Sequence, residues 1–403
     1  MVNDERLVGW GKDTAFLPYG ERWKRQRIIT QEVLDPSAAG ELYSKMIKQV
    51  RLSMQRLLHN PEGIAHEIRW MIASILLSSV YGYEASYPHD DLVKLVETSV
   101  DHMCEAGVPG NFFVNTLPWL IHVPSWFPGA GWKRKANEWR AEKDRVVNEP
   151  LEWTKSQMAS NKASYSISKA LLTKLVTDEV PKNRIEEEED IIRWVTTTLY
   201  SAGSDSETST ETSFILAMIL YPEVQRKAQA ELDNVLGGRL PELTDREALP
   251  YVNAVMKEVM RWRPAVPMGV AHSTTQDDVY RGFFIPKGTI VSMNVWSIGR
   301  DPKIYPNPED FNPDRYLDPN LPLSPVFSLG RRDCPGAHFA QSSMFLMMST
   351  FLTIFNVTAT PGKPFPEPKV RNNVLVAHPM PFDCTVTPRS EDRRRLIEQW
   401  VDF

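Results

Sequence analysis

The chain has 403 residues, of which 42% are hydrophobic, and its formal net charge is -5 at pH 7. This length and apolar content allow a large core, and the acidic balance gives no support for nucleic-acid binding. The three cysteines, Cys104, Cys334 and Cys384, are too few and too scattered for a disulfide framework or a zinc knuckle. The sequence has no signal peptide and no run of about 18 apolar residues, so we expect no transmembrane segment in this chain.

The first predicted helix follows Gly20 and carries a tryptophan and an arginine one turn apart. Trp23 and Arg27 stand at positions i and i+4, so their side chains share one face of the helix. An indole N–H and a guanidinium that point the same way form a pair of donors for an anionic group. The alternative is an exposed basic helix with one tryptophan packed inward.

Helical spacing of apolar residues continues over residues 39–80 and again over 134–160, with loops rich in glycine and proline between them. The loop at residues 112–132 is rich in aromatic residues, and Lys133, Arg134 and Lys135 follow it. Aromatic residues beside a basic cluster are typical of a segment that contacts a membrane surface. A buried loop is the other interpretation of this composition.

The longest predicted helix covers residues 183–220, with Asn183 as its N-cap and acidic residues at its positive end. At about 1.5 Å per residue, such a helix crosses a whole domain. Its middle, residues 201–206, combines small residues with Gly203 and Asp205. Glycine inside a helix costs about 1 kcal/mol relative to alanine. A defect of this kind favours a functional role, because it opens a groove or frees a carbonyl.

Two shorter helices are predicted at residues 222–236 and 251–262, and the second contains Glu258 and Arg261 at the spacing of an ion pair. After Pro264 the helical pattern gives way to short apolar runs. Residues 279–285 and 289–294 are predicted strands joined by a turn at 286–288, and a hairpin is predicted at 370–386. We therefore expect one mainly α domain with a smaller β portion: a helical part at about residues 20–262 and a strand- and loop-rich part at about 263–390.

One cysteine, Cys334, lies in a short loop at residues 327–336, directly before an apolar helix. A thiolate near neutral pH needs a metal, positive charge or N–H donors around it. Gly330 and Gly336 let the backbone turn with N–H groups near the sulfur, Arg331 and Arg332 add positive charge, and the helix points its positive end at the loop. We predict that Cys334 presents a thiolate to a metal. The alternative is a small buried hydrophobic residue before a helix.

This loop has the spacing F-x-x-G-x-R-x-C-x-G and resembles the haem-binding loop of the cytochrome P-450 superfamily. The middle of the long helix is similar to the oxygen-binding motif A-G-x-D-T of that family, with Ser206 in place of threonine. Glu258, Arg261 and Arg315 resemble the family's network behind the haem. Residues 17–20 and 125–131 look most like fungal microsomal members of secondary metabolism. The resemblance implies the cytochrome P-450 fold.

The resemblance also implies a cofactor and roles for individual residues. Haem b is the expected cofactor, and Cys334 is the expected axial ligand of its iron. The expected partners of the haem propionates are Trp23, Arg27, His272 and Arg332. Asp205 and Ser206 are expected to relay protons beside a dioxygen site that Gly203 opens. Ser206 keeps the hydroxyl but lacks the methyl group that fixes the rotamer of threonine.

The implied reaction is the hydroxylation or related oxidation of a hydrophobic small molecule with O2. The chain has no dinucleotide-binding motif, so its electrons must come from a partner. The resemblance implies an NADPH-dependent flavoprotein reductase, which could meet positive charge at Arg22, Lys24, Arg25 and Arg331. Eukaryotic family members carry a membrane anchor, first helices and first sheet strands before this point. We therefore expect an N-terminally truncated form, and a full-length form in the endoplasmic reticulum membrane.

Two other functions remain open at this stage. Some relatives on this scaffold rearrange peroxides or dehydrate their substrates without a reductase, and turnover without NADPH would reveal such an activity. The other possibility is a non-catalytic haem-binding fragment, which would bind haem without turnover. The sequence does not identify the substrate, because the residues that shape such pockets lie on variable loops.

Overall fold

The computed structural model describes residues 1–403 except 36–39, 109, 179, 372–374 and 401–403. The α-helices are α1 (Glu21–Val33), α2 (Gly40–His59), α3 (Ile64–Tyr81), α4 (Asp91–Gly107), α5 (Gly131–Ala159), α6 (Ile167–Thr177), α7 (Ile185–Leu220), α8 (Pro222–Leu236), α9 (Pro250–Trp262), α10 (Val295–Ile298), α11 (Ala337–Ile354) and α12 (Glu391–Glu398). The strands are β1 (His272–Ser273), β2 (Asp278–Tyr280), β3 (Phe283–Ile285), β4 (Ile290–Val291), β5 (Phe355–Ala359) and β6 (Cys384–Pro388).

Helix α7 is the central element of the helical part. It contacts helices from both halves of the sequence, including α1, α3, α4, α5, α9 and α11. Its first turn carries Glu186, Glu187 and Glu188, which favour the positive end of the helix. The single long helix predicted to end at residue 220 is confirmed, and Pro222 begins the next helix as expected. The predicted N-cap is wrong, because Asn183 lies in a 3-10 turn and Arg184 precedes the helix without a side-chain cap.

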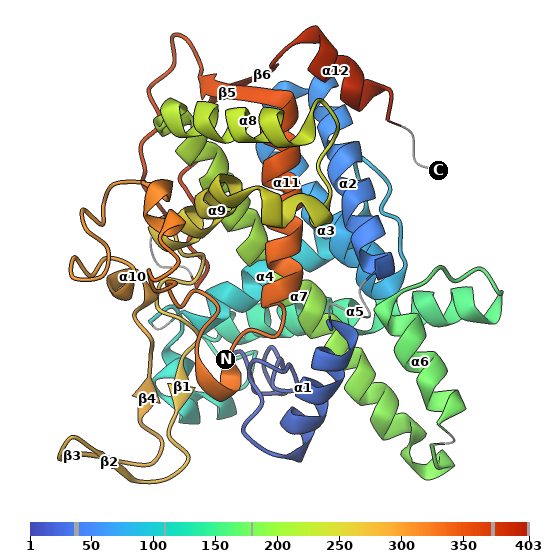
Figure 1. The fold of residues 1–403 in the computed structure, drawn as a ribbon. Helices are drawn as coiled ribbons and strands as arrows, with labels where there is room; N and C mark the ends of the chain where they lie inside the picture. Colours follow the sequence, from blue (N-terminus) through green and yellow to red (C-terminus); the bar gives the residue numbers. More distant parts are fainter. Residues whose placement is uncertain (36–39, 109, 179, 372–374, 401–403) are drawn as a thin grey trace.

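Helix α11 lies in the middle of the view in Figure 1, between α2 and α9. Every residue from Ser342 to Ile354 is buried, as expected for a helix that is apolar on all sides. The strand pair β5–β6 lies over the far end of α11, beside α8. This packing holds the beginning of α11, and the cysteine loop before it, against the rest of the helical part.

Two acidic side chains are buried in α7, and no described residue places a cation beside them. Glu207 and Glu211 are one helical turn apart and are 4% and 0% exposed. Burial raises the pKa of Glu207 to about 8, and burial together with the neighbouring Glu207 raises the pKa of Glu211 well above its usual range. Ser343 of α11 is the polar neighbour of Glu207. Both carboxyl groups are therefore held mainly in the neutral form at neutral pH.

Because of these two carboxyl groups, we expect the free energy of unfolding to fall as pH rises. The pKa of Glu207 is about 8 in the folded state and 4.5 in an exposed carboxyl, so folding retains a proton between these values. The contribution is complete below pH 4.5 and is lost as pH rises through about 8. The free energy of unfolding of the wild type should therefore fall between about pH 5 and 8. In Glu207→Gln this fall is expected to be smaller by on the order of 3 kcal/mol.

Thermal unfolding of wild type and Glu207→Gln across this pH range measures the effect. Glu186→Gln, which removes an exposed carboxyl from the first turn of the same helix, is the control and should keep the wild-type slope. Equal slopes for wild type and Glu207→Gln would contradict the prediction.

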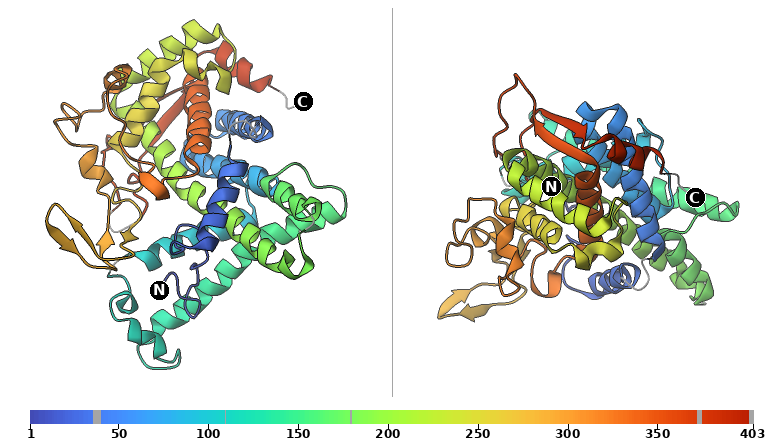
Figure 2. Two further views of the ribbon diagram at one scale, coloured as in Figure 1. Left: turned by 60° about the horizontal axis from the view of Figure 1, so that its bottom comes forward. Right: turned by 45° about the horizontal axis from the view of Figure 1, so that its top comes forward.

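The strands predicted at residues 279–285 and 289–294 are corrected by the structure. Residues 279–285 do not form one strand, because the chain reverses at Arg281 and Gly282, whose φ angles are 50° and 85°. β2 and β3 therefore pair with each other, with Tyr280 opposite Phe283. In the second segment only Ile290–Val291 is a strand, and it pairs with β1. The β2–β3 hairpin projects from the edge of the molecule in Figures 1 and 2.

The C-terminal hairpin predicted at residues 370–386 is also corrected. Val370 pairs with Pro379 in an isolated antiparallel bridge, and residues 372–374 of the predicted segment lie outside the described residues. The last part belongs to a different pair, because β6 runs antiparallel to β5 with Cys384 opposite Ala359. Turn signals report neighbours in the sequence and cannot reveal this longer-range partner.

Candidate functional site

The loop before α11 presents Cys334 in a fixed backbone geometry. The Cys334 N–H donates to the carbonyl of Phe327 over 2.8 Å. Gly330 has a φ of 77°, a left-handed conformation that glycine adopts without strain. A single 3-10 turn, Gly330–Arg332, then leads to the cysteine, and α11 begins shortly after it at Ala337.

The sulfur of Cys334 is surrounded by groups that suit a thiolate ligand. Protein atoms around the sulfur raise the pKa of the thiol, whereas the Gly336 N–H and the Arg27 guanidinium lower it. A Cβ at Gly336 would lie 3.9 Å from the sulfur, which places Gly336 in van der Waals contact with the ligand position. The residue is still exposed to solvent. Since the protein alone disfavours the charged form, a metal is the partner that would stabilise it.

Trp23 and Arg27 of α1 lie beside this loop and meet Arg332, which is about 300 positions later in the sequence. The Arg27 guanidinium donates to the backbone carbonyl and to a carboxylate oxygen of Asp333, each over 2.7 Å. Arg332 stacks over the Trp23 ring at 4.7 Å and donates to the carbonyl of Leu17 over 2.9 Å. Two guanidinium groups and an indole therefore gather next to Cys334, which favours a large anionic ligand there.

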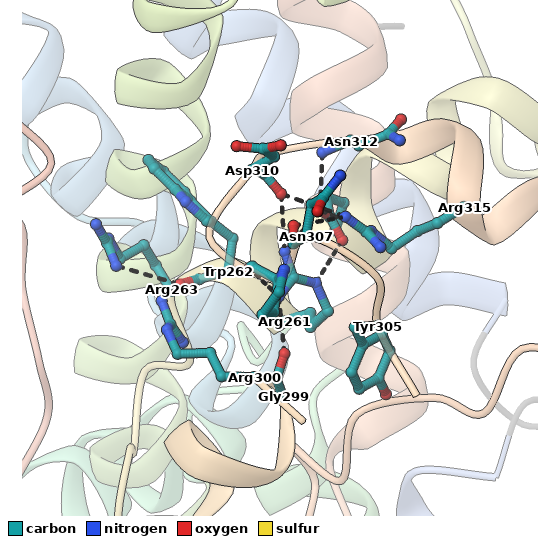
Figure 3. Close-up of polar contacts among 12 residues, drawn as sticks. Arg261, Trp262, Arg263, Gly299, Arg300, Tyr305, Asn307, Asp310, Asn312 and Arg315 are labelled. Carbon is teal, nitrogen blue, oxygen red and sulfur yellow. Dashed lines mark hydrogen bonds and ion pairs between the residues drawn. The ribbon is translucent and has the colours of Figure 1, made fainter. Parts of the chain in front are cut away.

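A buried ion network ties the segment before this loop to α9 (Figure 3). Arg261 donates two hydrogen bonds of 2.7 Å to Glu258, and both side chains are 0% exposed. Arg315 donates to the same carboxylate over 3.2 Å. This confirms the predicted association of the three residues.

The remaining donors of Arg261 bind backbone carbonyls. They reach Gly299, Pro308 and Asp310 over 2.7, 2.8 and 3.2 Å. A full set of acceptors is what makes a buried guanidinium tolerable. The network therefore fixes residues 299–315 against α9.

The middle of α7 has an open face. Ala202 is exposed, and Gly203 and Ser206 are half-buried, in a helix that is otherwise largely buried. The Ser206 hydroxyl donates to the Ala202 carbonyl over 2.9 Å. A Cβ at Gly203 would lie 3.2 Å from the methyl groups of Leu76 in α3. Close packing of α3 on α7 is thus a role for Gly203 that the sequence did not predict.

Asp205 has a partner that sequence reasoning missed. Nε2 of His378 lies 2.8 Å from a carboxylate oxygen of Asp205. No sequence signal pointed to this pair, because His378 lies in the irregular C-terminal segment. His272 begins β1 opposite Val291, and no hydrogen bond joins its ring to another residue in the part of the chain that the structure describes.

The sequence model of the cytochrome P450 family matches residues 2–386, which is almost the whole chain. The chain belongs to the cytochrome P450 family. This P450 is 39% identical over 402 residues to cytochrome P450 monooxygenase 208 of Postia placenta, covering 97% of this chain and 77% of the relative. It is 36% identical over 405 residues to a tryptamine 4-monooxygenase of Psilocybe cyanescens, covering 97% and 78%.

Solved structures agree with this assignment. A zebra fish cytochrome P450 with progesterone superposes with a TM-score of 0.78 at 26% identity, covering 96% of this chain and 88% of the other. The same kind of enzyme with abiraterone gives a TM-score of 0.75 at 25% identity, covering 97% and 87%. The predicted mainly α cytochrome P450 fold is confirmed. The protein is a haem-dependent monooxygenase that uses O2, electrons from a redox partner and a hydrophobic substrate.

The residues around Cys334 fit a haem. Cys334 is an exposed residue, the Gly336 N–H and the Arg27 guanidinium lower the pKa of its thiol, and Arg332 and Trp23 lie beside the loop. Cys334 can thus provide a thiolate for the haem iron, and the adjacent cations can bind the carboxylates of the haem propionates.

Proposed function

We propose that this P450 hydroxylates or otherwise oxidises a hydrophobic small molecule of fungal secondary metabolism, with electrons from NADPH delivered by a flavoprotein reductase. The observation that carries the proposal is the exposed Cys334 beside Arg27, Arg332 and Trp23. Cysteine ligation supplies the haem iron with the electron density that favours O–O cleavage. The names of the fungal relatives as monooxygenases support this function over rearrangement, dehydration or a non-catalytic role.

The proposed roles of the residues follow from their chemistry. Cys334 holds the iron through its sulfur, and the Gly336 N–H moderates the charge on that sulfur. Arg27 and Arg332, with the Trp23 indole, bind the propionates, and Arg27 exchanges its Asp333 partner for one of them. His272 is a fourth proposed propionate partner, from β1. Asp205 and Ser206 carry protons along the open face of α7, beside the dioxygen site proposed at Gly203.

Ser206→Ala tests the proton-carrying role. The change removes a hydroxyl that lies on the open face of α7 and little packing volume. We expect haem and substrate binding to persist, while severalfold more of the reducing equivalents are lost as hydrogen peroxide. The measurement is the ratio of product to peroxide per NADPH consumed.

Thr212→Ala is the matched control, because its hydroxyl also donates to a carbonyl one turn earlier in α7, over 2.7 Å to Thr208. An unchanged ratio in Ser206→Ala would show that protons enter by a route without this hydroxyl.

Electron delivery is proposed at the face near α1. Of the four cations expected to meet a reductase, three have acidic partners within the chain: Arg22 with Asp190, Lys24 with Glu21 and Arg25 with Glu188. Arg331 is exposed, stacks over the Tyr19 ring at 5.0 Å and has no carboxylate partner among the described residues. Arg331 is therefore the cation in this set best able to meet an acidic reductase surface.

We also propose that residues 113–127 contact the membrane of the endoplasmic reticulum. Phe113, Trp119 and Trp126 are 79%, 63% and 77% exposed, which contradicts the alternative of a buried loop. Exposed aromatic rings beside basic residues suit the interface between water and lipid. Within the ranges that the structure describes, no helix combines the length and apolar character needed to cross a membrane. The loop would then act as a surface contact.

The double variant Trp126→Ser/Phe127→Ser is expected to reduce binding to vesicles with anionic lipids severalfold in a sedimentation assay. Phe365→Ser is the matched control, since it removes a 63% exposed ring from another segment. Equal binding by wild type and the double variant would exclude the proposed contact.

A further inference from the structure

The contact between His378 and Asp205 joins the C-terminal segment to the oxygen-binding region of α7. Nε2 of His378 lies 2.8 Å from Oδ1 of Asp205. The two side chains are 17% and 20% exposed, so the pair is shielded from bulk water without being sealed from it. A histidine and a carboxylate in such a setting can share a proton.

The backbone around His378 is fixed on three sides. The hydroxyl of Ser209 in α7 donates to the Ala377 carbonyl over 2.6 Å. The Ala377 N–H donates to the carbonyl of Ala265 over 2.8 Å, and the Arg371 N–H donates to the carbonyl of His378 over 2.9 Å. These bonds hold the imidazole against α7 even when its own bond to Asp205 changes.

The other side of Asp205 borders a small polar cavity. Its volume is about 10 Å³, close to the least that accommodates one water molecule. The lining residues are Arg69, Glu97, Val100, Asp101, Ser204, Asp205 and Thr208. Arg69 of α3 and Asp101 of α4 are exposed, so the cavity borders solvent-accessible residues.

The charged and titratable groups that face Asp205 come from three elements. They are Arg69 on α3, Glu97, Asp101 and Cys104 on α4, and His378 in the C-terminal segment. Burial raises the pKa of Glu97, and the negative charges of Asp101 and Asp205 add to this effect while Arg69 opposes it. Acids therefore outnumber cations around Asp205, and a proton on this cluster is favourable.

We propose that His378 is a positioning residue for proton delivery, which holds the Asp205 carboxylate between the cavity and Ser206 and exchanges a proton with it. The inference rests on the proposed role of Asp205 and Ser206. In the exchange, the Nε2–H bond of an imidazolium breaks and an Oδ1–H bond forms, which leaves a neutral imidazole and a carboxylic acid. The imidazole regains its proton from a hydronium ion of the solvent, which becomes water, and Asp205 passes its proton towards Ser206.

Two substitutions separate holding from proton exchange. His378→Gln keeps an N–H donor for Asp205 but has no group that takes up or releases a proton between about pH 5 and 8. His378→Leu removes both properties. For wild type, we expect the fraction of electrons that reach product to fall as pH rises through this range. For His378→Gln we expect a lower fraction at acidic pH that no longer depends on pH, and for His378→Leu a severalfold increase in peroxide at all pH values.

A second measurement needs no turnover. Melting temperatures of wild type, His378→Gln, Asp205→Asn and the double variant form a cycle that measures the interaction of the two side chains. We expect the double variant to melt no lower than the less stable single variant at pH near 6. His66→Gln, which replaces an exposed histidine of α3, is the control. It should keep the wild-type pH profile, and adding it to the variants of the cycle should not change the measured interaction between His378 and Asp205.

The outcomes distinguish this inference from the function on which it rests. Suppose that Asp205→Asn releases peroxide, but His378→Gln keeps the wild-type pH profile or the two single-variant changes in melting temperature are additive. The role of His378 is then overturned, and the proposed role of Asp205 and Ser206 stands. If Asp205→Asn keeps the wild-type ratio of product to peroxide, the proposed role of Asp205 is wrong, and so is the role of His378 that rests on it. A flat profile in His378→Gln together with a non-additive cycle supports the proposal.

Discussion

Replacing Cys334 with serine is expected to abolish the strongly red-shifted Soret band of the reduced carbon monoxide complex. A neutral hydroxyl cannot supply the electron density of a thiolate. Changes to groups that only support a metal ligand lower activity by about 10- to 100-fold, so loss of the ligand itself should lower turnover by more than about 100-fold. Haem content, the absorption spectrum and product formation are the measurements.

Cys384→Ser is the matched control for this change. Cys384 is a half-buried free cysteine in β6, and burial raises the pKa of its thiol to about 11. This variant should keep both the red-shifted band and turnover. A Cys334→Ser protein with the same shifted band as wild type would exclude Cys334 as the ligand.

Glu258→Ala is expected to cause the largest loss of stability of any single change in the network behind the loop. The substitution leaves Arg261, which is 0% exposed, and the largely buried Arg315 without their shared carboxylate. Removing one partner of a buried ion pair costs about 3–5 kcal/mol, because the remaining charge stays in a poor solvent. The loop lies beyond this network, so haem content should fall together with the melting temperature.

Glu309→Ala is the comparison variant. Glu309 also pairs with an arginine, Arg300 at 3.1 Å, but its side chain is 73% exposed. Water replaces such a partner easily, so the expected loss is below about 1 kcal/mol. Chemical unfolding of both variants at equal haem content measures the difference. Similar losses in the two would show that burial does not decide the strength of the network.

The sequence alone determined the features that depend on local pattern. Apolar periodicity and the position of Pro222 predicted α7 and α8 with nearly the observed ends. The spacing around Cys334 identified the loop, and the motif residues Glu258, Arg261 and Arg315 were assigned to one network that the structure contains. Such features are readable because helix ends, turns and ligand spacings involve residues close together in the chain.

Local pattern failed for two strand pairs, one joined by a tight turn and one formed by segments farther apart in the sequence. The run at residues 279–285 lacks the usual Asn-Gly signal of a two-residue turn, so its reversal at Arg281 and Gly282 was missed. β6 pairs with β5, which directly continues α11, although the nearer segment was the predicted partner.

The sequence thus determined the family, the cysteine loop and the long helix that crosses the molecule. Only the tertiary structure decided that Asp205 faces His378, that Gly203 packs on Leu76, and that Glu207 and Glu211 are buried. The charge state of an acid depends on its solvent and neighbours, and these are set by helix packing. An acidic residue on α7 can therefore be a proton carrier, as proposed for Asp205, or a neutral core group, as Glu207 is. The amino-acid sequence of the helix does not distinguish the two.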